Sequence, residues 1–312
     1  HTNDRRQRQM CIRDSYSVMQ NDRTKSLLYF HFLVFLFGFT SILGVLIQLE
    51  ALPLVVWRMG IAALALGIYC LLIKRDNFKL PKKLTTKIIF SGILIGVHWI
   101  AFFHAIKVAG VSLTLSMLAT CAFFVAIIEP LYFKKKWLFY ELFFGTLAAA
   151  GILIIFWAEI ESLNGIVVAL IAAVLSALFS VVNSKMVLQV STITLTFYEL
   201  LIGFIALLFY LILVHPESLE KAIPSTSDIF WLLLLSIICT SYAMNATFIV
   251  MRKLTPFTIM MIINLEPVYG ILLDLAIFGE AAFLSIYFYI GFFVVMLAII
   301  ANGIFKMRKQ SS

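Results

Sequence analysis

Long apolar runs separated by short polar segments repeat along this chain. A helix that crosses the roughly 30 Å of hydrocarbon in a bilayer needs about 20 mostly apolar residues. Ten runs have about this length, and none alternates with the period of two that strands of a membrane barrel show. They span residues 27–47, 53–73, 88–108, 111–133, 138–157, 165–182, 192–214, 229–250, 257–278 and 284–305. The pattern predicts an all-α membrane protein with ten transmembrane helices.

The composition agrees with a chain that is solvated mainly by lipid. Apolar residues make up 62% and charged residues 13%, and the mean hydropathy is +1.04, whereas soluble domains contain about 25% charged residues. The net charge of +8 would suit a nucleic-acid partner, but the 24 lysines and arginines lie mostly in short loops between the apolar runs. This placement indicates a membrane protein and argues against a nucleic-acid-binding groove.

Lysine and arginine are unevenly distributed between the two sets of loops. If the ten runs cross the membrane in turn, 21 of the 24 basic residues fall on one side, together with both chain ends. Only Lys107 and Lys221 fall on the other side, and Arg58 lies within a run. Basic loops tend to stay in the cytoplasm, so both termini are predicted to be cytoplasmic.

The chain is predicted to consist of a polar arm at residues 1–26, two halves at 27–157 and 164–306, and a tail at 307–312. Met19 fits a native start, and residues 1–18 are interpreted as partly non-native. Shifting the second half by 140 to 146 residues matches the order of helices in the first, although few residues are identical. Five helices per half would invert the second half, and such inverted repeats are typical of secondary transporters that bind solute near the midplane.

Three segments carry a family resemblance. They are NLEPVYGILLDLAIFGE (264–280), TFYELLIGF (196–204) and VVWR (55–58). Together with the paired five-helix halves, they resemble the EamA type of the drug/metabolite transporter (DMT) superfamily over nearly the whole chain. The resemblance implies an exporter of a small metabolite or drug in the inner, cytoplasmic membrane, commonly driven by an ion gradient.

Eight residues inside the predicted runs are candidates for a pathway for solute and protons. Ionisable groups deep in hydrocarbon cost about 2.5–3.5 kcal/mol each on insertion scales, so they usually face a bundle interior or an aqueous cavity. The eight candidates are Glu266, Glu199, Arg58, Tyr198, His98, Trp99, Asn245 and Asn264.

Glu266 precedes Pro267, which lacks the amide that would bond to the carbonyl of Ile263, so a helix kink is predicted there. The carboxylate would carry a proton or bind a cationic group of the solute. The alternative is a buried glutamate that is hydrogen-bonded to Asn264 or to a neighbouring helix.

Glu199 and Arg58 occupy nearly matching places in the two halves. They would either pair across the cavity as the halves move or form a permanent salt bridge. His98 would suit a proton relay because histidine titrates near neutral pH, or it is a hydrogen-bonded packing residue. Asn245 and Asn264 offer amides that would bind a polar solute or join helices.

Other features of the runs are interpreted as structural. Glu129 and Glu141 are predicted to pair with the lysines at 134–136 at the membrane surface. Gly92 and Gly96, like the alanines at 169, 173 and 177, have the spacing of closely packed helices. The four cysteines show no CxxC spacing, and those in apolar runs are predicted to be small packing residues. They are Cys11 in the arm and Cys70, Cys121 and Cys239 in the runs.

The favoured function is a secondary active transporter that exports an amino acid, a related polar metabolite or a drug by alternating access with proton coupling. The alternatives are an intramembrane enzyme acting on a lipid-linked substrate, which would need clustered acids and bases near one interface, and a structural partner of another membrane protein. No Walker loop, HExxH or metal-binding spacing occurs, so no cofactor, metal or enzymatic activity is predicted. The predicted partners are a small-molecule solute, the bilayer and a coupling proton, with a homodimer left open.

Overall fold

A computed structural model describes residues 25–74, 79–158, 163–278 and 285–311 of the chain. Within these ranges every regular element is a helix, as the apolar runs predict. The arm before residue 25, including Cys11 and Met19, lies outside the described residues.

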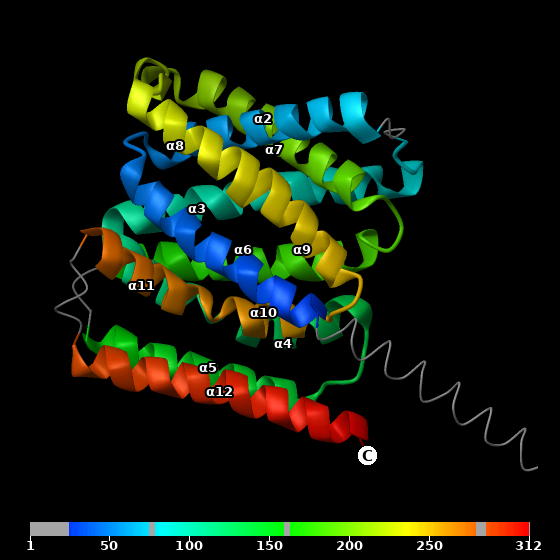
Figure 1. The fold of residues 1–312 in the computed structure, drawn as a ribbon, viewed down its shortest axis with the longest axis vertical. Coiled ribbons are helices and arrows are strands. Elements are labelled where there is room, and N and C mark those ends of the chain that lie inside the picture. Colours follow the sequence, from blue (N-terminus) through cyan, green and yellow to red (C-terminus); the bar gives the residue numbers. More distant parts are fainter. Residues whose placement is uncertain (1–24, 75–78, 159–162, 279–284, 312) are drawn as a thin grey trace, which may run out of the picture.

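The helices follow one another through the bundle shown in Figure 1. They are the N-terminal helix Lys25–Leu46, α2 Ala51–Tyr69, α3 Thr85–Leu118, α4 Cys121–Phe133, α5 Phe139–Ala158, α6 Leu163–Met186, α7 Thr192–Val214, α8 Thr226–Ser236, α9 Ala243–Met251, α10 Pro256–Ile263, α11 Glu266–Phe278 and α12 Ile286–Ser311. Short π or 3-10 segments extend or join them: η1 Cys70–Lys74, η2 Lys82–Leu84, η4 Pro216–Ser218, η5 Glu220–Ala222 and η6 Ile237–Tyr242.

Seven helical stretches of the described chain are long and apolar enough to cross a membrane. They are Lys25–Leu46, Ala51–Leu72, Lys82–Val111, Leu113–Phe133, Leu163–Met186, Thr192–Val214 and Thr226–Met251. Each overlaps one of the predicted runs. The three other predicted runs contain α5, the pair α10 and α11, and α12, whose apolar part Tyr289–Asn302 is shorter.

The fourth and ninth predicted runs are not continuous helices. Gly110, with φ of 78°, interrupts α3, and residues 111–118 are followed by a turn at 119–120 and then by α4. In the ninth run, α10 is followed by a turn at 264–265 and then by α11. The two breaks are alike: an eight-residue helical segment, at 111–118 and in α10, is followed by a two-residue turn and then by α4 or α11. Such breaks do not change the hydropathy of the sequence. The backbone groups that lose their helical hydrogen bonds are covered by protein rather than lipid, so the side chains around a break can remain apolar.

Two helices distant in sequence form a layer of their own. Figure 1 shows α5 and α12 side by side along one edge of the bundle. Gly151 and Gly291 lie where they meet, and a Cβ atom on Gly151 would be only 2.7 Å from the carbonyl oxygen of Gly291. The absence of side chains therefore allows the two backbones to approach closely.

Close packing also holds α3 against its neighbours. A Cβ atom on Gly92 would lie 2.7 Å from the carbonyl oxygen of Glu199 on α7, and one on Gly96 would lie 3.0 Å from Leu207. The alanines at 169, 173 and 177 on α6 are completely buried. The prediction that these small residues mark helix contacts is confirmed.

Candidate functional site

A cavity lies inside the bundle where the N-terminal helix, α2, α3, α6, η6, α9, α10 and α11 meet. The space between its lining atoms, counted out to its mouth, is about 840 Å³. Its aromatic lining consists of Phe37, Trp99, Phe102, Phe179 and Phe248. Its polar and charged lining consists of Thr40, Arg58, His98, Ser176, Ser180, Cys239, Thr247 and Glu266.

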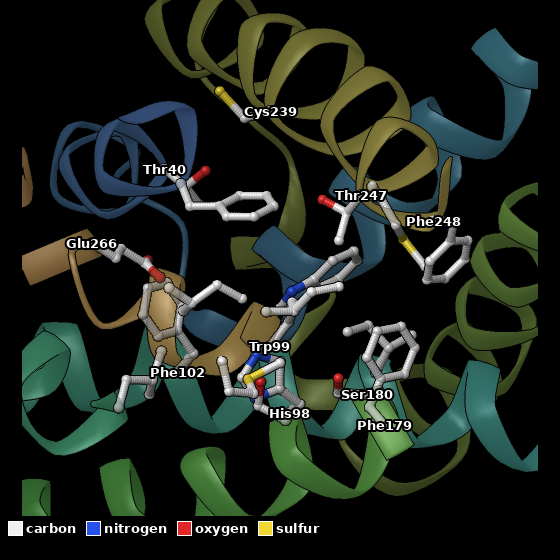
Figure 2. A pocket seen from close by; sticks show the side chains of 18 of the residues that line it. Thr40, His98, Trp99, Phe102, Phe179, Ser180, Cys239, Thr247, Phe248 and Glu266 are labelled. Carbon is white, nitrogen blue, oxygen red and sulfur yellow. The ribbon is translucent and has the colours of Figure 1, made fainter. Parts of the chain in front are cut away.

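The acidic group of the cavity lies opposite a wall of α9. Figure 2 shows Glu266 on one side and Thr247 with Phe248 on the other. His98 and Ser180 lie together along a third side, next to α3 and α6. Polar groups therefore face the cavity from several helices, while aromatic rings occupy much of the space between them.

Arg58 is the basic group of the cavity and is only 3% exposed. Its Nε donates a hydrogen bond of 2.7 Å to Thr240 Oγ1. Its guanidinium carbon lies 3.8 Å from the centroid of the Trp99 ring, which is a cation–π contact. The Nη1 atom has no hydrogen-bond partner in the structure, so Arg58 retains donor capacity for a ligand.

A local π-helix positions the partner of Arg58. Thr240 lies in η6, and its hydroxyl donates a 2.7 Å hydrogen bond to the carbonyl of Leu235, five residues earlier. The same oxygen accepts the bond from Arg58. Such π segments are often found at functional sites, and nothing in the hydropathy pattern predicted this one.

Glu266 is the first residue of α11 and directly follows the turn at 264–265. Pro267 is the next residue. Its missing amide hydrogen costs little stability here, because the backbone amides of a first helical turn have no hydrogen-bond partner within the helix. The helix dipole favours a carboxylate at this end. Arg58 and Glu266 interact electrostatically across the cavity, but no ion pair within contact distance joins them in the described chain.

His98 is held by a backbone group. Its Nδ1 lies 2.8 Å from the carbonyl oxygen of Ala172 and donates to it, since a carbonyl only accepts. The ring stacks on Phe102 with centroids 6.3 Å apart. His98 is therefore both a packed, hydrogen-bonded residue and part of the cavity wall.

The cavity contains only some of the eight candidates. Arg58, His98, Trp99 and Glu266 line it, whereas the other four do not. Among these, Asn264 lies in the helix break with both amide atoms unpartnered, and Tyr198 packs against Phe197. Asn245 lies on α9 and its Oδ1 atom has no partner.

Glu199 is completely buried in α7, away from the cavity. Its carboxyl group interacts with Ser91 and Asn183 on α3 and α6. No ion pair to Arg58 forms in this conformation, and neither carboxylate oxygen has a hydrogen-bond partner. The permanent salt bridge considered from the sequence is therefore not observed.

Several lining residues were not among the candidates. They are Thr40, Ser176, Ser180 and Thr247. Their hydroxyl groups are neutral and do not carry the high free-energy cost of a charge in the membrane, so these residues do not stand out in an apolar run. One usable signal was the spacing of Ser176 and Ser180, which puts two hydroxyls on one face of a helix.

Two further structural interpretations agree with the geometry. Lys135 forms a 3.1 Å ion pair with Glu129, as predicted for this end of the run. Three cysteines are buried and form no disulfide within the described residues, as predicted for small packing residues: Cys70, Cys121 and Cys239.

A comparison with protein families identifies the second half of the chain. Residues 163–303 match the EamA-like transporter family. This part of the chain belongs to the EamA-like transporters. This assignment and the apolar helices together describe a multi-pass membrane transporter of the DMT type.

The fold is shared with solved proteins. In all, 27 chains of solved structures match this EamA-like chain. One of them, a protein crystal structure, superposes with a TM-score of 0.71 over 91% of this chain and 98% of its own, at 15% sequence identity. At this identity the likeness establishes the fold alone. No curated protein sequence matched.

Proposed function

We propose that this EamA-like protein is a secondary active transporter that exports an amino acid, a related polar metabolite or a drug by alternating access. The observation that carries the proposal is one cavity inside the helix bundle that contains both Arg58 and Glu266. Buried charges in membrane helices normally serve a solute or ion pathway, because lipid does not tolerate them.

The charges of the cavity favour a solute with two ionic ends. Arg58 Nη1 is unpartnered and would donate to a carboxylate. Glu266 would accept an ammonium group, and the absence of an ion pair between them leaves both available to a zwitterion. The aromatic rings and Met244, Met251 and Met260 would contact an apolar side chain. We therefore favour an amino acid with a large apolar side chain, or a similar amphipathic compound.

Two inverted five-helix halves with cytoplasmic termini are the proposed architecture, in the inner membrane. The eight-residue segment and two-residue turn that the two broken helices share support a repeat. In Figure 1 the first described helix begins at the end of the bundle where α12 finishes, which supports placing both termini on one side. The excess of basic residues in these loops would put that side in the cytoplasm.

The breaks at 119–120 and 264–265 would serve as the flexible points of alternating access. Discontinuous helices frequently surround transporter sites and permit one half to rock against the other. Glu266 directly follows one break, so a movement there would reposition a cavity carboxylate. The driving force in this proposal is a proton gradient.

Reconstitution in liposomes tests the function. Purified protein would be given an imposed pH gradient and a panel of radiolabelled amino acids and nucleosides. We expect gradient-dependent flux of at least one zwitterion with an apolar side chain. A monodisperse, folded preparation without gradient-dependent flux of any tested compound would refute the transporter proposal.

A further inference from the structure

Glu199 is a buried carboxyl group with no role in the cavity. It is 0% exposed, and neither of its oxygens has a hydrogen-bond partner. Its backbone is fixed where α7 meets α3, because Gly92 leaves no room between the helices. A carboxylate that has only the neutral side chains of Ser91 and Asn183 beside it is strongly destabilised there unless it takes up a proton or pairs with a cation.

Charged or titratable groups on the surrounding helices are directed elsewhere. Arg58 on α2 contacts Thr240 and Trp99, and His98 on α3 bonds to Ala172. Lys87 on α3 is exposed, and the ammonium of Lys185 on α6 lies 4.2 Å from the centroid of the Phe133 ring. Arg252, after α9, donates to the carbonyls of Val187 and Val190. Among the residues that the structure describes, none of these cations is available to neutralise Glu199.

The side chain of Asn183 is oriented so that its Oδ1 atom can accept a hydrogen bond. Its Nδ2 donates to Ser91 Oγ at 2.7 Å and to the carbonyl of Phe179 at 3.2 Å. The second bond fixes the orientation of the amide, because only the NH₂ group has hydrogens for a carbonyl. Asn183 Oδ1 is consequently an acceptor, and it has no partner.

Protonation of Glu199 would provide hydrogen bonds for its own carboxyl oxygens and for Asn183 Oδ1. A neutral carboxyl group donates its O–H to the vacant Asn183 Oδ1, and the Ser91 hydroxyl donates to the other carboxyl oxygen. An ionised carboxylate has no hydrogen to donate, so Asn183 Oδ1 would remain without a partner. Buried acceptors without donors are costly, so the cluster favours the protonated acid.

A strip of polar side chains on α6 leads from the cavity to this cluster. Ser176 and Ser180 line the cavity, and Asn183 follows Ser180 by three residues, on the same helix face. That step is a rise of about 4.5 Å along the axis. Ser180 Oγ is buried without a partner and, like His98, Ser180 lines the cavity (Figure 2). It is the nearest lining hydroxyl on α6 to Asn183 in sequence.

We propose that Glu199, Ser91 and Asn183 form a proton-binding site that is separate from the solute site and is reached from the cavity past Ser180. The inference rests on the proposed transport function, since it assigns the coupling proton to a particular group. Solute binding is then performed by Arg58 and Glu266, while Glu199 carries the proton.

Two transport assays separate the roles. One is exchange of the same amino acid at equal concentration and pH on both sides, and the other is accumulation driven by a pH gradient. Glu199→Gln keeps an N–H donor for Asn183 and mimics the protonated acid, so it should fold. We expect it to retain exchange and lose gradient-driven accumulation, whereas Glu266→Gln loses both. Glu220→Gln, the same change at an exposed loop residue, should lose neither.

The inference would be overturned, with the transporter intact, if Glu199→Gln accumulated solute like the wild type. It would also be overturned if this folded variant lost exchange as completely as Glu266→Gln. Accumulation that follows a sodium gradient and ignores the pH gradient would also overturn it.

A second measurement does not depend on transport. Infrared spectra of the purified protein in lipid nanodiscs, recorded over a range of pH, report the C=O band of protonated carboxyl groups. We expect one band at neutral pH that is absent in Glu199→Gln and shifted in Asn183→Leu. If the wild-type protein shows no flux, the proposed function fails, but this band still decides whether Glu199 holds a proton. Spectra identical in wild type and Glu199→Gln would exclude the site.

Discussion

The guanidinium group of Arg58 lies against the face of Trp99, with 3.8 Å between its central carbon and the ring centroid. The charge is thus held at the cavity wall by an aromatic ring and by the hydroxyl of Thr240, without a carboxylate in contact. A buried cation held in this way keeps its positive charge available to a solute.

Trp99→Leu should weaken solute binding by about tenfold. A desolvated cation–π contact contributes ~1–2 kcal/mol, and without the ring the guanidinium would no longer be fixed toward the cavity. The measurement is calorimetric titration with the amino acid that the transport assay selects. Trp99→Phe, which keeps an aromatic face, should lose less; equal losses in the two variants would argue against the cation–π contact.

Glu266→Gln should abolish coupled flux while the protein remains folded. The amide keeps the shape of the side chain but removes the charge that would receive an ammonium group. Flux in liposomes and elution on size-exclusion chromatography test the two parts. Wild-type flux in this variant would make Glu266 a structural residue.

Thr240→Val should destabilise the protein by about 1.5–3 kcal/mol, the usual worth of a hydrogen bond to a charged group. Valine has the same shape but leaves Arg58 Nε without an acceptor. Denaturant unfolding in detergent would measure the loss. Thr146→Val makes the same change on α5, where the hydroxyl bonds only within its own helix, and should have a much smaller effect.

Gly92→Ala should destabilise the contact between α3 and α7 by about 1–3 kcal/mol, the typical cost of overpacking. The added methyl group would lie 2.7 Å from the backbone oxygen of Glu199, which cannot rotate away. At Gly67 the nearest atom is 3.2 Å away in the Phe197 side chain. Gly67→Ala should therefore be tolerated better, and similar unfolding midpoints for both variants would contradict this packing argument.

The orientation can be tested with single cysteines in a background without the native ones. Lys83→Cys and Lys136→Cys should react with a membrane-impermeant maleimide from the same side, and Glu220→Cys from the opposite side. Labelling of positions 83 and 136 from opposite sides would disprove the proposed topology.

The apolar runs were sufficient to predict the helices, because a membrane helix makes its backbone hydrogen bonds within itself and its length is set by the bilayer. The same local reasoning identified Arg58 and Glu266, since a charge in such a run is conspicuous wherever the helix packs. The family could also be recognised, because its motifs are local segments of sequence.

The orientation of each helix about its axis could not be predicted in this way. Arg58 and Glu199 looked equivalent, yet one lines the cavity and the other is buried between α3, α6 and α7. Helices that are apolar on every side have no polar stripe to show which face turns inward, so packing against neighbours decides it. For the same reason the broken helices, the π-helix at Thr240 and the hydroxyls of α6 became evident only from the assembled bundle.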